Sequence, residues 1–248
     1  MIASQNLDPV TYLTGAHTDV PRPPAVTEPG LGGKFQPTGV PLPYPGNTVL
    51  CHINQDSGAF DALVRLQDRL KQGPLAEAFT FLPQASLHMT VFDGISGPSD
   101  SPPDWPADIS KDTPRDKVSE ILLGRLSNQS WRQSFRISPV TLFAGHSLVV
   151  TGADAAETVA IADTRVAVRS ATRLNGRNFD SYRQHITLAY LLRWLTAEEA
   201  AAVEAHAADC YGQFVAEMAT SDIGIGPMEF CDFEDMHHFE PRALLTRP

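Results

Sequence analysis

The chain has 248 residues, 42% of them hydrophobic, and a formal net charge of -10, with a pI of about 5.2. An acidic surface argues against tight binding to long nucleic acid, because that affinity comes mainly from Lys and Arg side chains that neutralise phosphates. The three cysteines, Cys51, Cys210 and Cys231, show neither a disulfide framework nor metal-motif spacing, which predicts a reducing, cytoplasmic location. No basic segment followed by an apolar one starts the chain, and no long apolar window exists, so neither a secretion signal nor a membrane span is expected.

Residues 1–45 are rich in Pro and Gly, as in Pro21-Arg22-Pro23-Pro24 and Gly30-Leu31-Gly32-Gly33. This composition predicts an irregular N-terminal arm that wraps the body or is partly mobile. Residues 1–30 have little periodic apolar content, so we expect them to add little to the core. Residues 46–248 are expected to form a single two-lobed domain.

Beyond the arm, short apolar strands alternate with amphipathic helices and polar turns. The expected strands are 47–54, 87–92, 135–142, 147–151, 183–191, 223–225, 228–233 and 238–240. The expected helices are 60–70, 115–127, 155–174 and one that starts at the capping box Thr196-Ala197-Glu198-Glu199. Gly73-Pro74 ends the first of them, and a Pro-rich loop is expected over 98–114. The two halves of this order are loosely alike. They predict an α+β fold with two lobes, two mostly antiparallel sheets facing a central cleft, and helices outside.

One short motif occurs twice. Leu87-His88-Met89-Thr90-Val91-Phe92 and His185-Ile186-Thr187-Leu188-Ala189-Tyr190 both contain His-x-Thr within an apolar strand. Because side chains on a strand alternate between its two faces, each His shares a face with its Thr. Two such strands brought together would form a symmetric pocket with two imidazoles and two hydroxyls.

Two imidazoles in one cleft suit general acid–base catalysis, since imidazole titrates near neutral pH. Opening a cyclic phosphodiester needs a base for the attacking water and an acid for the leaving oxygen, and hydroxyl donors stabilise the charge that develops on phosphorus oxygens. With eight histidines in the chain, a single His-x-Thr is expected by chance about half the time. Two copies in matching strands, one in each half, are much harder to attribute to chance.

The paired motifs resemble those of the two-histidine (2H) phosphoesterase superfamily, which includes LigT-like RNA ligases and cyclic phosphodiesterases of nucleotide and RNA metabolism. The family pattern is apolar-His-x-Thr/Ser-apolar, present twice, and both copies here match it. The resemblance implies pseudo-twofold symmetry, no metal or cofactor, and a catalytic set of His88, Thr90, His185 and Thr187. It covers most of the chain after residue 45, although the arm and segment 45–52 are more similar to a bacterial and fungal subgroup than to the best-known members.

Four other residues are candidates for substrate binding. Arg183 precedes His185 by two positions and could hold phosphate, unless it is a surface residue at a strand end. Phe92 could stack on a base, although a core position is the commoner role for Phe. His52 lies opposite an apolar strand face and could face the cleft or be structural, and Tyr44 could close over a ligand from the arm.

The sequence thus predicts a monomeric, metal-independent phosphoesterase that acts on a 2',3'-cyclic phosphate or similar phosphodiester of a nucleotide or RNA end. One alternative is a non-catalytic module that binds a nucleotide or phosphate in the same cleft. Another is a His-dependent metallohydrolase, although the adjacent His237 and His238 would point to opposite faces of a strand and make a poor chelate. The direction, hydrolysis or ligation, and the assignment of acid and base between the histidines stay open.

Overall fold

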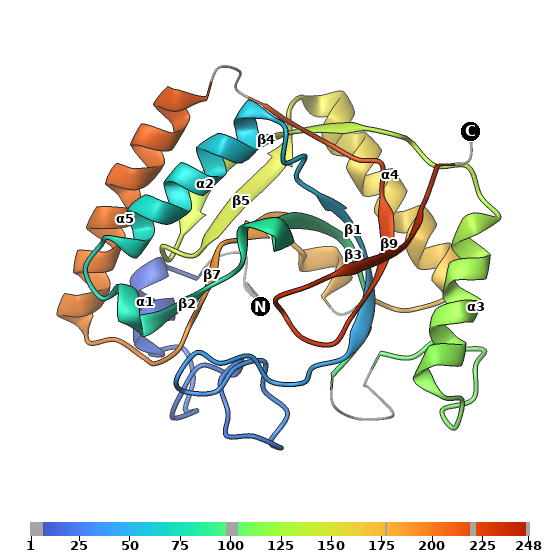
Figure 1. The fold of residues 1–248 in the computed structure, drawn as a ribbon, viewed down its shortest axis with the longest axis horizontal. Coiled ribbons are helices and arrows are strands. Elements are labelled where there is room, and N and C mark those ends of the chain that lie inside the picture. The colour runs from blue at the N-terminus through green and yellow to red at the C-terminus, as the bar shows by residue number, and fades with distance from the viewer. Residues whose placement is uncertain (1–6, 98–103, 177, 219–221, 247–248) are drawn as a thin grey trace.

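The computed structural model describes residues 7–97, 104–176, 178–218 and 222–246. A curled antiparallel sheet of eight strands, in the order β10-β9-β1-β3-β6-β5-β4-β8, forms the centre, and β2 and β7 form a small second sheet (Figure 1). The strands of the large sheet are β1 (Gly46–His52), β3 (His88–Ser96), β4 (Phe135–Phe143), β5 (Ser147–Gly152), β6 (His185–Thr187), β8 (Ile223–Ile225), β9 (Glu229–Phe233) and β10 (Glu240–Leu244). The small sheet pairs β2 (Phe79–Phe81) with β7 (Ala189–Leu191).

The two halves of the chain repeat one arrangement. In the first half β1 leads through helix α2 (Gly58–Lys71) to motif strand β3, and in the second β5 leads through helix α4 (Ala155–Thr172) to motif strand β6. A short 3-10 turn precedes each motif strand, at Gln84–Ser86 and Phe179–Ser181. The α+β class is confirmed, but the halves share one sheet because Met89 of β3 pairs with Ile186 of β6.

Helices cover the sheet in two pairs (Figure 1). Helix α2 packs against α5 (Ala197–Glu217), and α3 (Arg115–Ser127) packs against α4. Helix α5 begins with the predicted capping box, in which Thr196 and Glu199 bond each other's backbone N–H groups. Leu63 and Leu66 of α2 are fully buried, as their helical spacing predicts.

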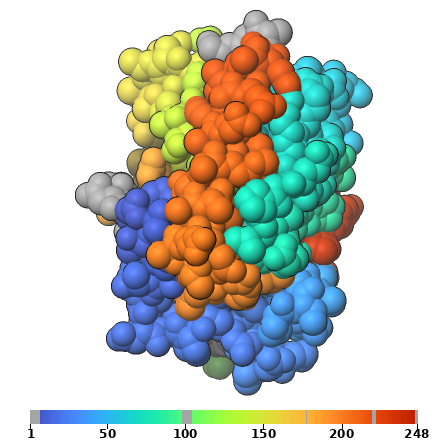
Figure 2. All heavy atoms as spheres, turned by 90° about the vertical axis from the view of Figure 1, so that its left-hand side faces the viewer, coloured from blue at the N-terminus to red at the C-terminus, as the bar shows by residue number. Residues whose placement is uncertain are grey.

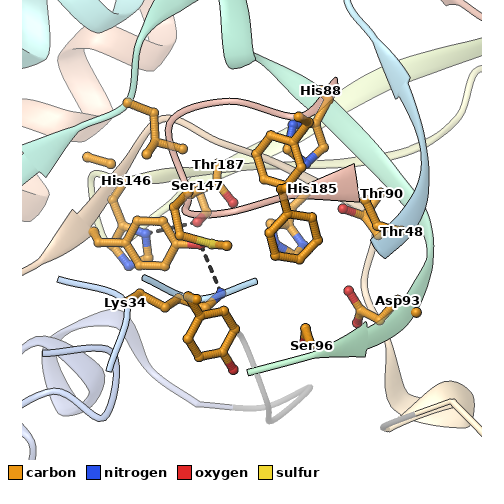
Figure 3. Close-up of a pocket in the computed structure, with 18 of the residues that line it drawn as sticks. Lys34, Thr48, His88, Thr90, Asp93, Ser96, His146, Ser147, His185 and Thr187 are labelled. Carbon is orange, nitrogen blue, oxygen red and sulfur yellow. Dashed lines mark hydrogen bonds between the residues drawn. The ribbon is translucent and has the colours of Figure 1, made fainter. Parts of the chain in front are cut away.

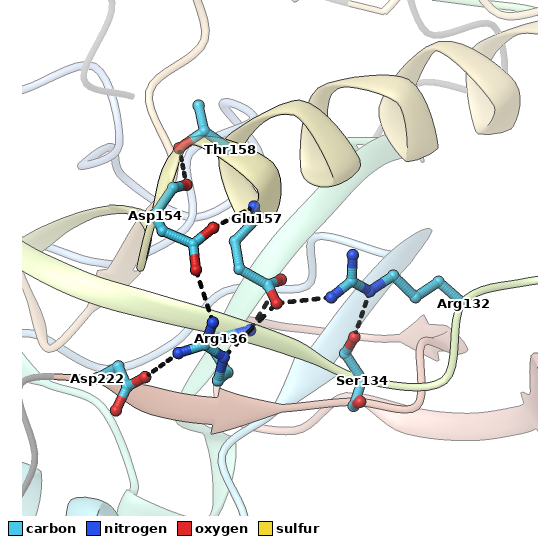
Figure 4. Close-up of polar contacts among 7 residues, drawn as sticks. All are labelled: Arg132, Ser134, Arg136, Asp154, Glu157, Thr158 and Asp222. Atoms are coloured by element: carbon cyan, nitrogen blue, oxygen red, sulfur yellow. Dashed lines mark hydrogen bonds and ion pairs between the residues drawn. The ribbon is translucent and has the colours of Figure 1, made fainter.

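An ion-pair network joins α4 to the far edge of the sheet (Figure 4). Arg136 of β4 contacts Asp154, the N-cap of α4, at 2.6 Å and Asp222 beside β8 at 2.8 Å. The buried carboxylate of Glu157, in the first turn of α4, accepts from Arg132 at 2.6 Å. A buried carboxylate needs such partners because its desolvation is costly. The network therefore fixes the start of α4, which leads to the second motif.

The arm packs against the body and places a few apolar side chains in its core, and how much they add to stability stays a prediction. Helix α1 (Pro9–Thr14), capped by Asp8, packs against α5, and Figure 2 shows the arm lying against α5. Leu13 is fully buried and Val26 is 1% exposed. Such contacts follow no regular period in an irregular segment, so the apolar pattern does not reveal them. The division of the chain at residue 45 stays a prediction.

Three segments differ from the predicted elements. The expected strand 183–191 is two strands, β6 and β7, because the chain switches sheets at Leu188, whose N–H donates to the carbonyl of His146. Strand β2, its partner in the small sheet, was not predicted. The last strand begins at Glu240 instead of His238. Residues 98–103 of the predicted loop 98–114 lie outside the described residues. Within the described part of the chain, no helix is long and apolar enough to span a membrane.

Candidate active site

The structure brings both motifs to one cavity of about 130 Å³ (Figure 3). His88 and Thr90 reach it from β3, and His185 and Thr187 from β6. Because Met89 pairs with Ile186 in an antiparallel register, the strand geometry sets His88 beside Thr187 and His185 beside Thr90. Met89 and Ile186 point the other way and are fully buried. The two His-x-Thr faces therefore form one site related by a local twofold.

Both imidazoles are oriented by the same backbone contact. Nδ1 of His88 lies 2.7 Å from the carbonyl oxygen of Ser86, and Nδ1 of His185 lies 2.8 Å from that of Arg183. A carbonyl oxygen only accepts, so each Nδ1 carries the proton and donates it. In the neutral ring this leaves Nε2 with a free lone pair that can take up a proton. Each carbonyl belongs to the residue two positions before its histidine, so the local twofold extends to this contact.

Burial favours the neutral form of both rings. It lowers the pKa of His88 to about 3; the hydrogen bond to the Ser86 carbonyl opposes this shift, and the neighbouring His52, His185 and Lys34 add to it. Burial likewise lowers the pKa of His185 to about 4. Each neutral ring can act as a base. A general acid at this site requires a negative charge in the cavity, which would raise the pKa of one imidazole.

The other predicted binding residues are placed differently. Tyr44 lines the cavity. Arg183 contributes its backbone carbonyl to His185, and its side chain is not among the described residues that line the cavity.

Phe92 belongs to the core, so its predicted stacking role is wrong. It is 3% exposed, and its ring lies 6.0 Å from that of Phe179. The cause is a bulge in β3, where Val49 of β1 pairs with Phe92 and the next residue, Leu50, pairs with Thr90. The extra residue reverses the alternation after Thr90. Phe92 therefore turns to the core, and Asp93 turns to the cavity.

His52 lies behind His88 and is not among the described cavity-lining residues. Its Nδ1 is 2.9 Å from Oε2 of Glu229, and its ring centroid is 5.9 Å from that of His88, edge to face. His52, Glu229 and Cys231 each offer a ligand atom within 4.8 Å of the others, which is a possible metal-binding arrangement. The carboxylate already satisfies the imidazole, so a structural hydrogen bond accounts for the geometry equally well.

Several polar residues of the cavity were missed in the sequence. They are Lys34, Asn47, Thr48, Asp93, Ser96, His146, Ser147, Tyr182 and Tyr190. Four of them had a signal, because Gly46-Asn47-Thr48-Val49 at the start of β1 is repeated as Gly145-His146-Ser147-Leu148 at β5. This second repeat, Gly-x-Thr/Ser-apolar, supplies residues from both halves to the same cavity. Lys34 has no such signal because it lies in the arm.

Residues 34–147 match the family model 2H-phosphodiest, described as a domain of unknown function (DUF1868). The crystal structure of the conserved protein of unknown function ATU0111 from Agrobacterium tumefaciens str. C58 is similar over 97% of this chain and 100% of that one. Its sequence identity is 29% and its TM-score 0.86. A search of curated proteins found no match. The matched segment contains the arm's Lys34, the first motif and Ser147, so the similarity covers residues that line the cavity.

Proposed function

We propose that this chain, which belongs to the two-histidine phosphoesterase superfamily, hydrolyses a phosphodiester by general acid–base catalysis without a metal. The substrate we propose is a 2',3'-cyclic phosphate, or a similar strained phosphodiester, of a nucleotide or RNA end. The observation that carries the proposal is the pair of imidazoles in one cavity, each with Nδ1 bonded to a carbonyl and Nε2 left for proton transfer.

The reaction uses the two rings in opposite roles. Nε2 of one neutral histidine takes a proton from water as the water oxygen forms a bond to phosphorus. The bond from phosphorus to one ribose oxygen breaks, and Nε2–H of the other histidine donates a proton to that oxygen. The protons then redistribute through solvent and restore the starting state. The phosphodiester brings the negative charge that the acid needs, since it raises the pKa of the adjacent imidazole.

The threonine hydroxyls stabilise the transition state. Thr90 and Thr187 share the cavity face with the histidines and can donate to the non-bridging phosphorus oxygens as negative charge builds up on them. Tyr182 stands beside Thr90, and burial raises the pKa of its phenol, so it stays a neutral donor. Hydroxyl donors and imidazoles together supply what a metal-bound water would provide in a metallohydrolase.

The test is turnover of 2',3'-cyclic nucleotides by purified, EDTA-treated protein and by variants. His88→Asn and His185→Asn should each lose a factor of about 10² to 10⁴ in kcat. The double variant should be little worse than the poorer single one, because the two groups act as a unit. His238→Asn is the control, since that side chain is 75% exposed. Tight binding of the nucleotide with no turnover would instead support the non-catalytic binding module.

A further inference from the structure

The arm places one lysine in the cavity. Lys34 lies between the buried Gly33 and Phe35, and its backbone is fixed by bonds from its N–H to the Ala25 carbonyl, 2.7 Å, and from the Leu42 N–H to its carbonyl, 2.8 Å. Its side chain enters the cavity that the two motifs share (Figure 3). The arm therefore holds this ammonium in a defined position.

Two tyrosines surround the ammonium of Lys34. Nζ lies 5.3 Å and 5.2 Å from the ring centroids of Tyr44 and Tyr190 and donates to the Tyr190 hydroxyl at 3.2 Å. An ammonium has three donors. Within the described part of the chain, Tyr190 is the only hydrogen-bond partner of Nζ, and no carboxylate lies within ion-pair distance of it. Aromatic faces stabilise a cation only partly. Burial acts to lower the pKa of Lys34, but Tyr190, Tyr44 and Asp93 outweigh it and hold this pKa above its usual value, so the ammonium stays charged. Asp93 is the only carboxylate among the described residues that line the cavity, and it forms no ion pair with Nζ. An anion can therefore use the donors of Nζ that Tyr190 does not occupy.

The ammonium lies in the same cavity as the two motifs. Lys34 lines this cavity together with His88, Thr90, His185 and Thr187 (Figure 3). Besides burial, the charge of Lys34 contributes to the lowered pKa of both imidazoles. An anion bound in this cavity can therefore contact Nζ and the motif residues together.

We propose that Lys34 binds the phosphate of the substrate and that this substrate carries a single phosphate group. The proposal rests on the proposed function, because the anion is identified by the reaction at the two motifs. A phosphodiester carries one negative charge at neutral pH and can bind one ammonium. Among the described residues that line the cavity there is no second Lys and no Arg, and Asp93 adds a negative charge to the lining. A diphosphate would bring in charge that this lining does not neutralise, and its burial would be costly.

Phosphate binding measured by calorimetry, together with turnover of a 2',3'-cyclic nucleotide, tests the proposal. Lys34→Met keeps an unbranched stem between Tyr44 and Tyr190 but removes the charge, and Lys34→Arg keeps the charge. Lys71→Met is the matched control, because Lys71 also lies over a ring, Phe81 at 5.8 Å, but bonds Gln67 and Asp68 on α2 and does not line the cavity.

Lys34→Met should weaken inorganic phosphate binding about 10-fold to 100-fold, as expected for a lost charged hydrogen bond, and raise KM for the cyclic nucleotide. The Kd of Lys34→Arg for phosphate should lie within a few-fold of the wild-type value, and that of Lys71→Met should equal the wild-type value. In the ligand-free protein, Lys34→Met should also shift the NMR titrations of His88 and His185 to higher pH. The wild type should bind the cyclic nucleotide more tightly than ADP.

Phosphate binding by Lys34→Met equal to that of a catalytically active wild type would overturn the role of Lys34 and leave the proposed function standing. Phosphate binding that depends on Lys34, with no ester turned over, would support the anion site and reject the hydrolase. No phosphate binding by the wild type would overturn this inference. If Lys34→Met does not fold, acetylation of the wild type decides the matter by mass spectrometry. Phosphate should protect Lys34 and not Lys71, and equal modification with and without phosphate would reject the proposal.

Discussion

Acidification below pH 6.5 should destabilise this protein because burial lowers the pKa of three of its histidines. Burial lowers the pKa of His88 to about 3, that of His185 to about 4 and that of His146 to about 3. In the unfolded chain a histidine titrates near 6.5. Below pH 6.5 the unfolded state therefore binds protons that the folded state does not, and stability falls with pH until the folded values are reached. The stability is fully present above pH 6.5.

The magnitude follows from the width of this window. Between pH 6.5 and 5 each of the three histidines lowers the free energy of unfolding by about 2 kcal/mol, because one pH unit corresponds to 1.36 kcal/mol for each proton. Glu204 has the opposite effect on stability. Burial raises the pKa of Glu204 to about 7, so between pH 6.5 and 5 the folded state binds a proton at Glu204 that the unfolded state does not. It is only partly buried, and at most it cancels one histidine. The net loss is about 4 kcal/mol or more, a large fraction of the 5 to 15 kcal/mol typical of a domain.

Urea unfolding at pH 7, 6 and 5, followed by tryptophan fluorescence, measures this loss. His185→Asn should lower the dependence of the unfolding free energy on pH by about 1.4 kcal/mol per unit, whereas His238→Asn, at an exposed position, should leave it unchanged. Added phosphate should reduce the loss, because an anion in the cavity favours protonated imidazoles. A wild type that loses less than about 1 kcal/mol between pH 7 and 5 would refute the neutral, buried state of these rings.

Three further predictions concern turnover. The pH profile of kcat/KM, which reports the free enzyme, should have its optimum on the acid side of pH 6.5, because the pKa values of His88 and His185 are about 3 and about 4. The optimum of the kcat profile should lie at higher pH, because the bound phosphodiester raises the pKa values of these histidines. Coincident profiles would contradict this effect of the substrate. Thr90→Val and Thr187→Val should each lower kcat about 10-fold to 100-fold with smaller effects on nucleotide affinity, so unchanged kcat would remove the hydroxyls from the chemistry. EDTA should leave turnover unchanged. If EDTA instead abolishes turnover, and zinc restores it in the wild type but not in His52→Ala, then His52, Glu229 and Cys231 hold a catalytic metal.

The motif strands could be predicted because their signal is local and occurs twice. His88 and Thr90 share a face by the period-2 rule, and so do His185 and Thr187. Only their meeting in one sheet requires tertiary structure, through the Met89 and Ile186 pair. Helices α2 to α5 begin within a few residues of their predicted positions because apolar periodicity and caps both mark them, as the Thr196 capping box shows. Helix α1, in the segment predicted to be irregular, has no such apolar period.

The remaining site residues depend on features that no period reveals. A bulge of one residue moves Phe92 from the cavity face to the core and puts Asp93 in its place. Lys34 reaches the cavity because Phe35, fully buried, anchors an irregular arm. In such a segment each contact is specified by a single side chain and not by a pattern. The local twofold of the motifs therefore does not extend to the whole cavity, since the arm adds Lys34 from one side only.

Whether the arm is part of the cooperative core can be tested at one residue. Leu13 is fully buried, and its carbonyl accepts the N–H of Leu195, which leads into α5. Leu13→Ala removes buried methyl groups and leaves a cavity, so the unfolding free energy should fall by about 2 to 5 kcal/mol in a single transition. The control is Leu31→Ala in the same arm, 71% exposed, which should change it by at most about 0.5 kcal/mol. A loss below about 1 kcal/mol at Leu13, or a separate early transition, would mean that the arm unfolds independently of the body. The position of Lys34 depends on this outcome, because an arm that opens independently would carry the ammonium out of the cavity.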